Sequence, residues 1–151
     1  MSVATAVKPS LTVKRRFNAP PDKVFAAWTD PKKIARWFGP PGSTVNEATF
    51  ETRAGGQFMI FCKAPNGEEF HVSGVVQEAI ADRRLVYSWA WRSTPERVSL
   101  VTVDLKPDGD GTLLSLTHDQ FFDDAARDRH KQGWDYGLDK LEAYLAQPQT
   151  A

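Results

Sequence analysis

Hydrophobic and polar residues alternate in short stretches along most of the chain before residue 120. In the first stretch, Leu11, Val13 and Phe17 alternate with polar residues, which is the period of a strand with one buried face. Turn signals rich in Gly, Pro, Asn and Asp then divide the chain at regular intervals. The pattern predicts seven antiparallel strands, near residues 10–17, 43–52, 57–63, 69–80, 84–92, 97–106 and 112–119.

Helical periodicity is found in two places. After the first strand, Pro21 and Pro31 each open a short helix, because proline at the first helical turn loses no hydrogen bond. Asp30 is the expected N-cap of the second, which would carry Ile34, Trp37 and Phe38 on one face. A long helix is expected from Asp123 or Asp124 to Ala146. Its apolar stripe consists of His130, Trp134, Leu138, Leu141 and Leu145.

The strand near 84–92 has the strongest alternation, with Leu85, Tyr87, Trp89 and Trp91 all expected to face inward. Together with Trp134 of the long helix, they predict a cavity walled by aromatic rings and suited to a flat apolar molecule. A plain aromatic core is the alternative.

Glycines bear on the same cavity. Gly133 and Gly137 lie one turn apart in the long helix, which favours either close packing of a neighbouring element or room for a ligand. The loop at residues 39–42 has glycines at both ends and two prolines between them, and we interpret it as a lid over the cavity.

The hairpin at Asn66-Gly67 sets which face of its two strands is buried. A loop of two or four residues would pair positions that sum to 133. One face, expected to line the cavity, would then hold Met59, Phe61, Phe70, Val72, Gly74 and Val76. Phe58, Ile60 and Val75 would lie outside, where a second subunit could cover them, and this predicts a homodimer. A three-residue loop would exchange the two faces.

Composition limits the kinds of partner that the protein is expected to bind. The 151 residues are 41% hydrophobic and 25% charged, with 19 basic and 19 acidic side chains. These values fit one soluble domain, and the balanced charge gives no reason to expect binding to nucleic acid or membranes. Cys62 is the single cysteine, and neither a leader nor an apolar run of membrane-spanning length is present, so a cytoplasmic location is expected.

No catalytic, cofactor or metal motif is recognisable. His71, His118 and His130 lack metal-site spacing, and Cys62 has no local feature that would lower its pKa. His118 and His130 could meet across the cavity, with Asp119, Tyr87 or Glu78 nearby. A structural role is the favoured interpretation for both, and proton transfer by His118 is the alternative.

Arginines are candidates for holding an anionic ligand group, although pairing with neighbouring acids is the usual role of arginine on strands. The candidates are Arg15, Arg53, Arg84, Arg92 and Arg97. Arg15 shares a face with Leu11 and Phe17 and needs a partner if that face is buried; Glu78 is the expected one.

The element order resembles the helix-grip fold of the START-like (SRPBCC) superfamily, which includes the birch-pollen allergens. Local motifs resemble its branch of activator-of-heat-shock-ATPase homologues (AHSA1-like). These motifs are Phe17-Asn-Ala-Pro-Pro-Asp-Lys-Val-Phe25, Trp28-Thr-Asp-Pro31, Arg36-Trp37-Phe38, Gly55-Gly56, Gly67 with Gly74, Arg84-Leu85-Val86-Tyr87-Ser88-Trp89, and Gly133-Trp134 with Leu138. The resemblance covers about residues 11–146.

The resemblance implies an α+β fold in which a curved seven-stranded antiparallel sheet wraps the C-terminal helix and leaves a cavity. One domain is expected at residues 10–147, with tails at 1–9 and 148–151. The favoured function is binding of a small apolar or aromatic ligand. One alternative is a chaperone cofactor acting on a heat-shock ATPase, although this sequence does not include the separate N-terminal domain of such activators. The other is a cavity enzyme of cyclase, dehydratase or hydrolase type.

The expected ligand-binding residues are those predicted to face the cavity. They are Trp37, Phe38, Met59, Phe61, Phe70, Val72, Val76, Tyr87, Trp89, Trp91, His118, His130, Trp134 and Leu138.

Overall fold

The computed structural model describes residues 8–147, and the predicted order of elements is confirmed. The elements are β1 (Leu11–Phe17), α1 (Pro21–Thr29), α2 (Pro31–Ile34), β2 (Thr44–Phe50), β3 (Gln57–Lys63), β4 (Glu69–Ile80), β5 (Arg84–Trp91), β6 (Ser99–Asp108), β7 (Gly111–Asp119) and α3 (Asp124–Ala146). Most of the two predicted tails, residues 1–7 and 148–151, lies outside the described residues.

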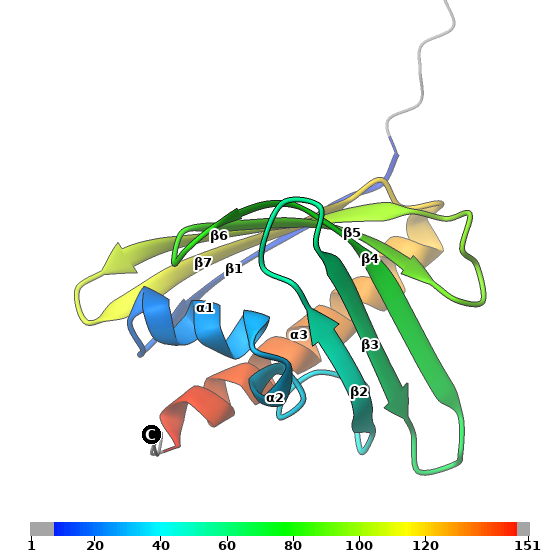
Figure 1. Ribbon diagram of the computed structural model, residues 1–151, viewed down its shortest axis with the longest axis horizontal. Coiled ribbons are helices and arrows are strands. Elements are labelled where there is room, and N and C mark those ends of the chain that lie inside the picture. Colours follow the sequence, from blue (N-terminus) through cyan, green and yellow to red (C-terminus); the bar gives the residue numbers. More distant parts are fainter. Residues whose placement is uncertain (1–7, 148–151) are drawn as a thin grey trace, which may run out of the picture.

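One antiparallel sheet has the strand order β1-β7-β6-β5-β4-β3-β2. The strands from β2 to β7 follow each other as hairpins, and β1 pairs with β7, so the first two strands form the opposite edges. The segment containing α1 and α2 carries the chain from one edge to the other. The sheet curves over α3, and α1 and α2 lie at one end of this arch (Figure 1). This is the predicted helix-grip fold.

Aspartates begin two of the helices as expected. The Asp30 carboxylate accepts a hydrogen bond from the backbone N–H of Lys32, and the Asp123 carboxylate accepts one from Ala126. The second helix is shorter than predicted, because α2 ends at Ile34 and Trp37 lies in the turn that follows. The backbone N–H groups of Trp37 and Phe38 still donate to the Ile34 carbonyl, which keeps both rings close to α2.

α3 packs closely against β1 and α1, and less closely against the strands on the other side of the arch. Leu138 and Leu141 on this helix are 0% exposed. The predicted partner of Arg15 was wrong: its guanidinium pairs with Asp139 of α3 at 2.6 Å and so ties β1 to the helix. Glu78, on β4, pairs with Arg84 instead.

The register between β3 and β4 differs from the favoured prediction. Phe58 pairs with Gly74 and Ile60 with Val72, so paired positions sum to 132. The cause is a three-residue loop closed by backbone hydrogen bonds of Ala64, in which Gly67 has φ of +88°. The alternative that the sequence left open is therefore the correct one.

A register shift of one residue exchanges the two faces of β3. Met59 and Phe61 were wrongly assigned to the inner face, and Phe58 and Ile60 are buried there. Of the apolar residues expected beneath a second subunit, only Val75 is on the outer face, where it is 49% exposed. The homodimer prediction thus loses the observation on which it rested.

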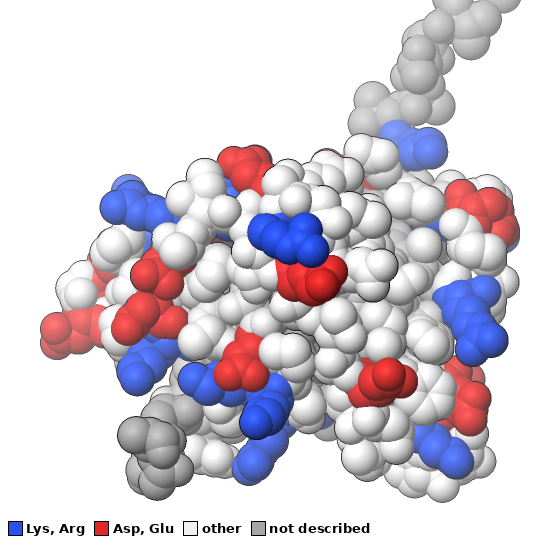
Figure 2. All heavy atoms as spheres, in the orientation of Figure 1, with Lys and Arg blue, Asp and Glu red and all other residues white. Residues whose placement is uncertain are grey.

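Charged residues of both signs are interspersed on the face that Figure 2 shows. No helix within residues 8–147 is long and apolar enough to cross a bilayer. Across the same residues, potential metal ligands do not gather in groups of three or more.

Candidate functional site

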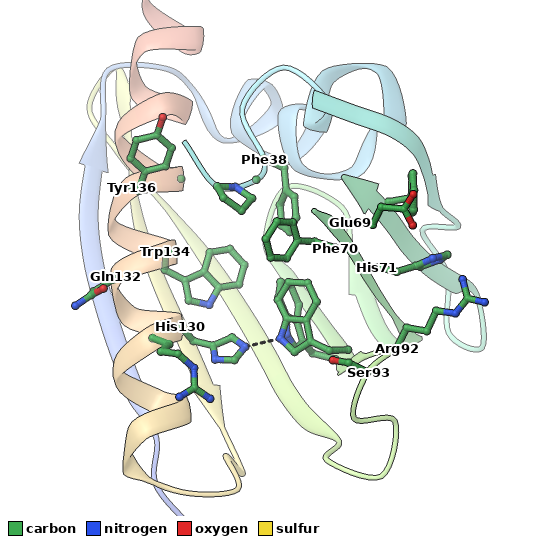
Figure 3. A pocket seen from close by; sticks show the side chains of 18 of the residues that line it. Phe38, Glu69, Phe70, His71, Arg92, Ser93, His130, Gln132, Trp134 and Tyr136 are labelled. Carbon is green, nitrogen blue, oxygen red and sulfur yellow. Dashed lines mark hydrogen bonds between the residues drawn. The ribbon is translucent and has the colours of Figure 1, made fainter. Parts of the chain in front are cut away.

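A pocket of about 1030 Å³ lies between the first half of α3 and the strands β3–β5. Rings from several elements surround it: Phe38 follows α2, Phe70 comes from β4, and Trp134 comes from α3 (Figure 3). Gly39, Pro40 and Pro41 of the predicted lid loop complete the lining at one end. The volume is at the upper end of the range typical of sites for small ligands.

The structure brings together some of the predicted site residues and excludes others. Those around the pocket are Trp37, Phe38, Phe61, Phe70, Trp89, Trp91, His130 and Trp134. Those that do not line it are Met59, Val72, Val76, Tyr87, His118 and Leu138. The β3 register puts both Met59 and Phe61 on the outer face; Met59 is absent from the pocket, whereas Phe61, nearer the end of β3, still borders it. The other five are buried in the packed core beneath the sheet.

The two helix glycines both line the pocket, but for different local reasons. A Cβ atom added to Gly133 would meet no other atom within 4 Å, so close packing does not require a glycine there. At Gly137 the nearest atom would belong to the Trp37 ring, at 3.8 Å, which is an ordinary contact. Neither position shows the close backbone approach that the sequence left open, and at Gly133 the space is empty.

His130 forms part of the pocket wall as a neutral hydrogen-bonded group. The indole N–H of Trp91 donates to His130 Nε2 at 2.9 Å, as the dashed line in Figure 3 shows. Since Nε2 accepts, Nδ1 carries the proton and donates to the Ala126 carbonyl at 2.7 Å. Burial and, to a smaller extent, the nearby Arg129 charge lower the pKa of His130, and together they outweigh the Ala126 hydrogen bond that raises it. Both ring nitrogens are already used within the protein.

His118 lies behind the pocket wall and is 0% exposed. Trp134 donates its indole N–H to Nδ1 at 2.9 Å, so Nε2 carries the proton and donates to Ser99 Oγ at 2.7 Å. The Ser99 hydroxyl donates in turn to the Trp89 carbonyl. Burial lowers the pKa of His118 to about 2, with a smaller contribution from His130. A buried and fully hydrogen-bonded neutral imidazole has a structural role here.

The rings of His118 and His130 do meet, with centroids 5.2 Å apart, but the polar cluster imagined around them does not form. Tyr87 accepts a hydrogen bond from the Trp28 indole, and burial raises the pKa of its phenol above the ordinary value. Glu78 pairs with Arg84. Asp119 Oδ1 is buried without a hydrogen-bond partner within residues 8–147.

Cys62 is also poorly placed to act as a nucleophile. Its side chain is buried, and burial raises the pKa of the thiol to about 11, although the Lys140 charge lowers it to a lesser degree. A thiol with such a pKa is almost entirely protonated at neutral pH and is a weak nucleophile.

Of the arginines that the sequence offered as candidates for an anionic ligand group, Arg92 and Arg97 line the pocket, but sequence reasoning missed its other polar residues. Arg129, Gln132 and Tyr136 line it from α3 beside the two glycines, and Ser93 and Thr94 line it from the loop after β5. A signal was present in the helix: positions 129, 132, 133, 136 and 137 follow the spacing of one helical face, next to the apolar stripe. The loop residues gave no comparable signal, because no periodicity links them to the strand before them.

With this geometry established, comparison with known proteins identifies the family. The family model described as "Activator of Hsp90 ATPase homolog 1-like protein" matches residues 18–146. The chain belongs to this family. Comparison with curated proteins finds no match.

Solved structures with the same fold include other members or relatives of this activator-homologue family. The AHSA1 protein from Silicibacter pomeroyi is 28% identical with a TM-score of 0.82, and the alignment covers 91% of this chain and 98% of that one. A protein from Rhodobacter sphaeroides is 26% identical with a TM-score of 0.82 over 99% of both chains. CalU16 from Micromonospora echinospora is 31% identical with a TM-score of 0.70, covering 91% of this chain and 76% of its own.

Proposed function

We propose that this protein binds a small apolar or aromatic molecule in the pocket between α3 and β3–β5, and so sequesters or senses it. The observation that supports this most is the pocket itself, which has a volume of about 1030 Å³ and whose walls are largely aromatic rings. Clefts of this size with largely apolar and aromatic walls are the usual form of small-ligand sites. An open space beside a well-packed core is therefore expected to have a use.

Binding would come mainly from burial of ligand carbon. Burying roughly 200 Å² of apolar ligand surface contributes about 5 kcal/mol, before the cost of immobilising the ligand. Trp91 and Trp134 present fixed rings, because each indole N–H is held by a histidine nitrogen. Rings that are fixed before the ligand arrives lower the entropic cost of binding.

The loop at residues 39–42 is the element that we expect to admit the ligand. Gly39 and Gly42 have φ values of +112° and +74°, which other residues adopt only with strain. The Ser43 hydroxyl donates to the Pro40 carbonyl and closes the loop on itself. Movement at the two glycines would open the pocket while Pro40 and Pro41 keep the tip stiff.

Existing contacts of the two histidines argue against a catalytic role for the pocket. His130 has no free ring nitrogen, and His118 does not line the pocket. His71 does line it and its Nδ1 has no hydrogen-bond partner within residues 8–147, but this nitrogen is buried and out of reach of a reacting group. A general acid or base must reach the reacting group with an available proton or lone pair. Binding without chemistry is the function that the geometry supports best.

The neutral fluorescent probe N-phenyl-1-naphthylamine tests this proposal. We expect its fluorescence to rise on binding to the protein. Gly133→Phe places a ring in the empty space beside α3 and should weaken binding at least about tenfold, which corresponds to 1.4 kcal/mol. Gly133→Ala is the matched control, since it also removes the glycine but adds only a methyl group; its affinity should stay within about twofold.

Equal binding by the wild type and Gly133→Phe would place the probe elsewhere and contradict the proposal. No fluorescence response from the wild type would contradict it as well. Native mass spectrometry of protein purified gently from its own host then gives the mass of any ligand that is carried through.

A further inference from the structure

The charged residues around the pocket are not balanced like those elsewhere. Three arginines line it, Arg92 and Arg97 after β5 and Arg129 on α3, against a single carboxylate, Glu69. The chain as a whole has no net charge. The mouth of the pocket therefore carries more positive than negative charge, although the protein as a whole is neutral.

These arginines also differ in their partners. Away from the pocket, several basic side chains form ion pairs with carboxylates: Arg15, Arg16, Arg53, Arg84, Arg127 and Lys131. Within residues 8–147, Arg92 and Arg129 form no such pair. The Arg97 guanidinium lies over the Phe122 ring, 3.9 Å from its centroid.

An unpaired arginine on an open surface has no special meaning, and Arg83 in the turn after β4 is such a case. What distinguishes Arg92 and Arg129 is that they approach one aromatic pocket from two different elements. Arg92 and His130, the neighbour of Arg129, lie on opposite sides of the cavity in Figure 3, and the Arg92 side chain points outward from the rings. Arg129 is also close enough to His130 for its charge to lower the pKa of that imidazole.

Hydrogen-bonding capacity at the pocket points the same way. The acceptor nitrogens of His118 and His130 are already occupied by indole donors. The indole N–H of Trp89, which lines the pocket, is buried without a partner within the described residues. Guanidinium groups are donors only. Other polar side chains of the lining, such as Gln132 and Ser93, can accept as well as donate, so the guanidinium groups are what specify a ligand group that accepts.

We infer that the ligand of this pocket is an aromatic or apolar anion of the carboxylate class, whose charged group lies at the mouth in the positive field of Arg92 and Arg129. This inference rests on the proposed function, since it concerns the same pocket. Guanidinium forks match the geometry of a carboxylate and remain protonated at all physiological pH values. Glu69 at the rim opposes the anion, and its side chain points away from the rings in Figure 3.

A matched pair of ligands separates charge from shape. 2-Naphthoate and 2-naphthamide share the bicyclic ring and the planar terminal group but differ in charge, and isothermal titration gives the affinity for each. We expect the wild type to bind the carboxylate at least about fivefold more tightly. Added salt should weaken binding of the carboxylate but not of the amide, because the arginines are exposed and their field is screened.

Variants then assign the preference to the two arginines. Arg92→Gln with Arg129→Gln should weaken naphthoate binding about tenfold and change naphthamide binding by less than about twofold. The control is Lys14→Gln with Arg83→Gln, which removes the same charge at exposed positions outside the pocket and should leave both affinities unchanged. Circular dichroism checks that both double variants are folded.

The other outcomes contradict either the inference about charge alone or the proposed function as well. If the wild type binds both ligands equally, or if the arginine variant loses affinity for both alike, the inference about charge is wrong while the pocket function stands. If the control variant loses the preference as well, the effect is one of net charge and the inference is again wrong. If neither ligand binds at about 1 mM, both this inference and the proposed function fail, since a Kd of that size corresponds to a binding free energy of only about 4 kcal/mol.

Discussion

The two halves of the arch differ in how completely they are filled. Near β1, β7 and α1, the second half of α3 is packed solid, with Leu114, Leu116, Leu138 and Leu141 at 1% exposure or less. Near β3–β5, the first half of the same helix faces a pocket of about 1030 Å³. A single straight helix beneath a curved sheet cannot lie close to every strand, so contact with one edge leaves space at the other.

On the proposed function, stability and ligand binding would depend on different parts of the same helix. Aliphatic side chains adapt to each other and fill the closed half. In the open half, hydrogen bonds between rings, such as that from Trp91 on β5 to His130 on α3, join the sheet to the helix and fix the rings in place. Substitutions in the two halves should therefore affect different properties.

The largest expected effect is on stability in the closed half. Leu138→Ala removes a fully buried side chain and should lower the free energy of unfolding by about 3 kcal/mol. Phe70→Ala in the pocket wall should cost only about 1 kcal/mol, because this half-buried ring already borders open space. Urea unfolding followed by tryptophan fluorescence measures both. Equal losses would show that the two halves are packed alike.

The same pair of variants should behave in the opposite way in probe binding. Phe70→Ala removes a pocket ring and should weaken binding of N-phenyl-1-naphthylamine, whereas Leu138→Ala should leave it largely unchanged at temperatures where the variant is folded. A loss confined to Leu138→Ala would contradict the division of the helix.

The next largest effect is the pH dependence of stability that the buried His118 causes. The pKa of His118 is about 2 in the folded protein against 6.5 for an unperturbed histidine, so below pH 6.5 only the unfolded state takes up the proton. Stability should fall as the pH is lowered, by about 2 kcal/mol between pH 6.5 and 5. The lowered pKa of His130 acts in the same direction.

Urea midpoints at several pH values measure this dependence. His118→Leu should be less stable at neutral pH, because it leaves the Trp134 indole and Ser99 without their partner, but its stability should depend less on pH. An equally steep dependence in the variant would assign the effect to other groups.

The smallest expected effects come from helix propensity, at one position in each half of α3. Gly133→Ala should raise stability by about 0.5 to 1 kcal/mol, because an added Cβ meets nothing within 4 Å and the flexibility of the unfolded chain is reduced. Ala143→Gly at an exposed position in the second half should lower stability by a similar amount. Thermal unfolding detects both shifts. A loss of stability in Gly133→Ala would show that the open half needs this glycine for packing.

Much of the fold was predictable because its signals are local. The caps at Asp30 and Asp123 and the alternation from Leu85 to Trp91 each lie within a few residues, and the structure has them as expected. The face of β3 was not predictable, because one residue more or less in the loop at Asn66-Gly67 reverses it. The partner of Arg15 was missed since Asp139 is more than a hundred residues away in the sequence.

The sequence alone determined the order of the elements, the aromatic strand and the apolar stripe of α3, because these depend on periodicity and on turn residues. Only the tertiary structure decided where the space between sheet and helix remains, which rings border it, and that Arg92 and Arg129 share its mouth. The reason is geometric: the volume left between two curved elements depends on how closely they approach, and no local pattern records that distance.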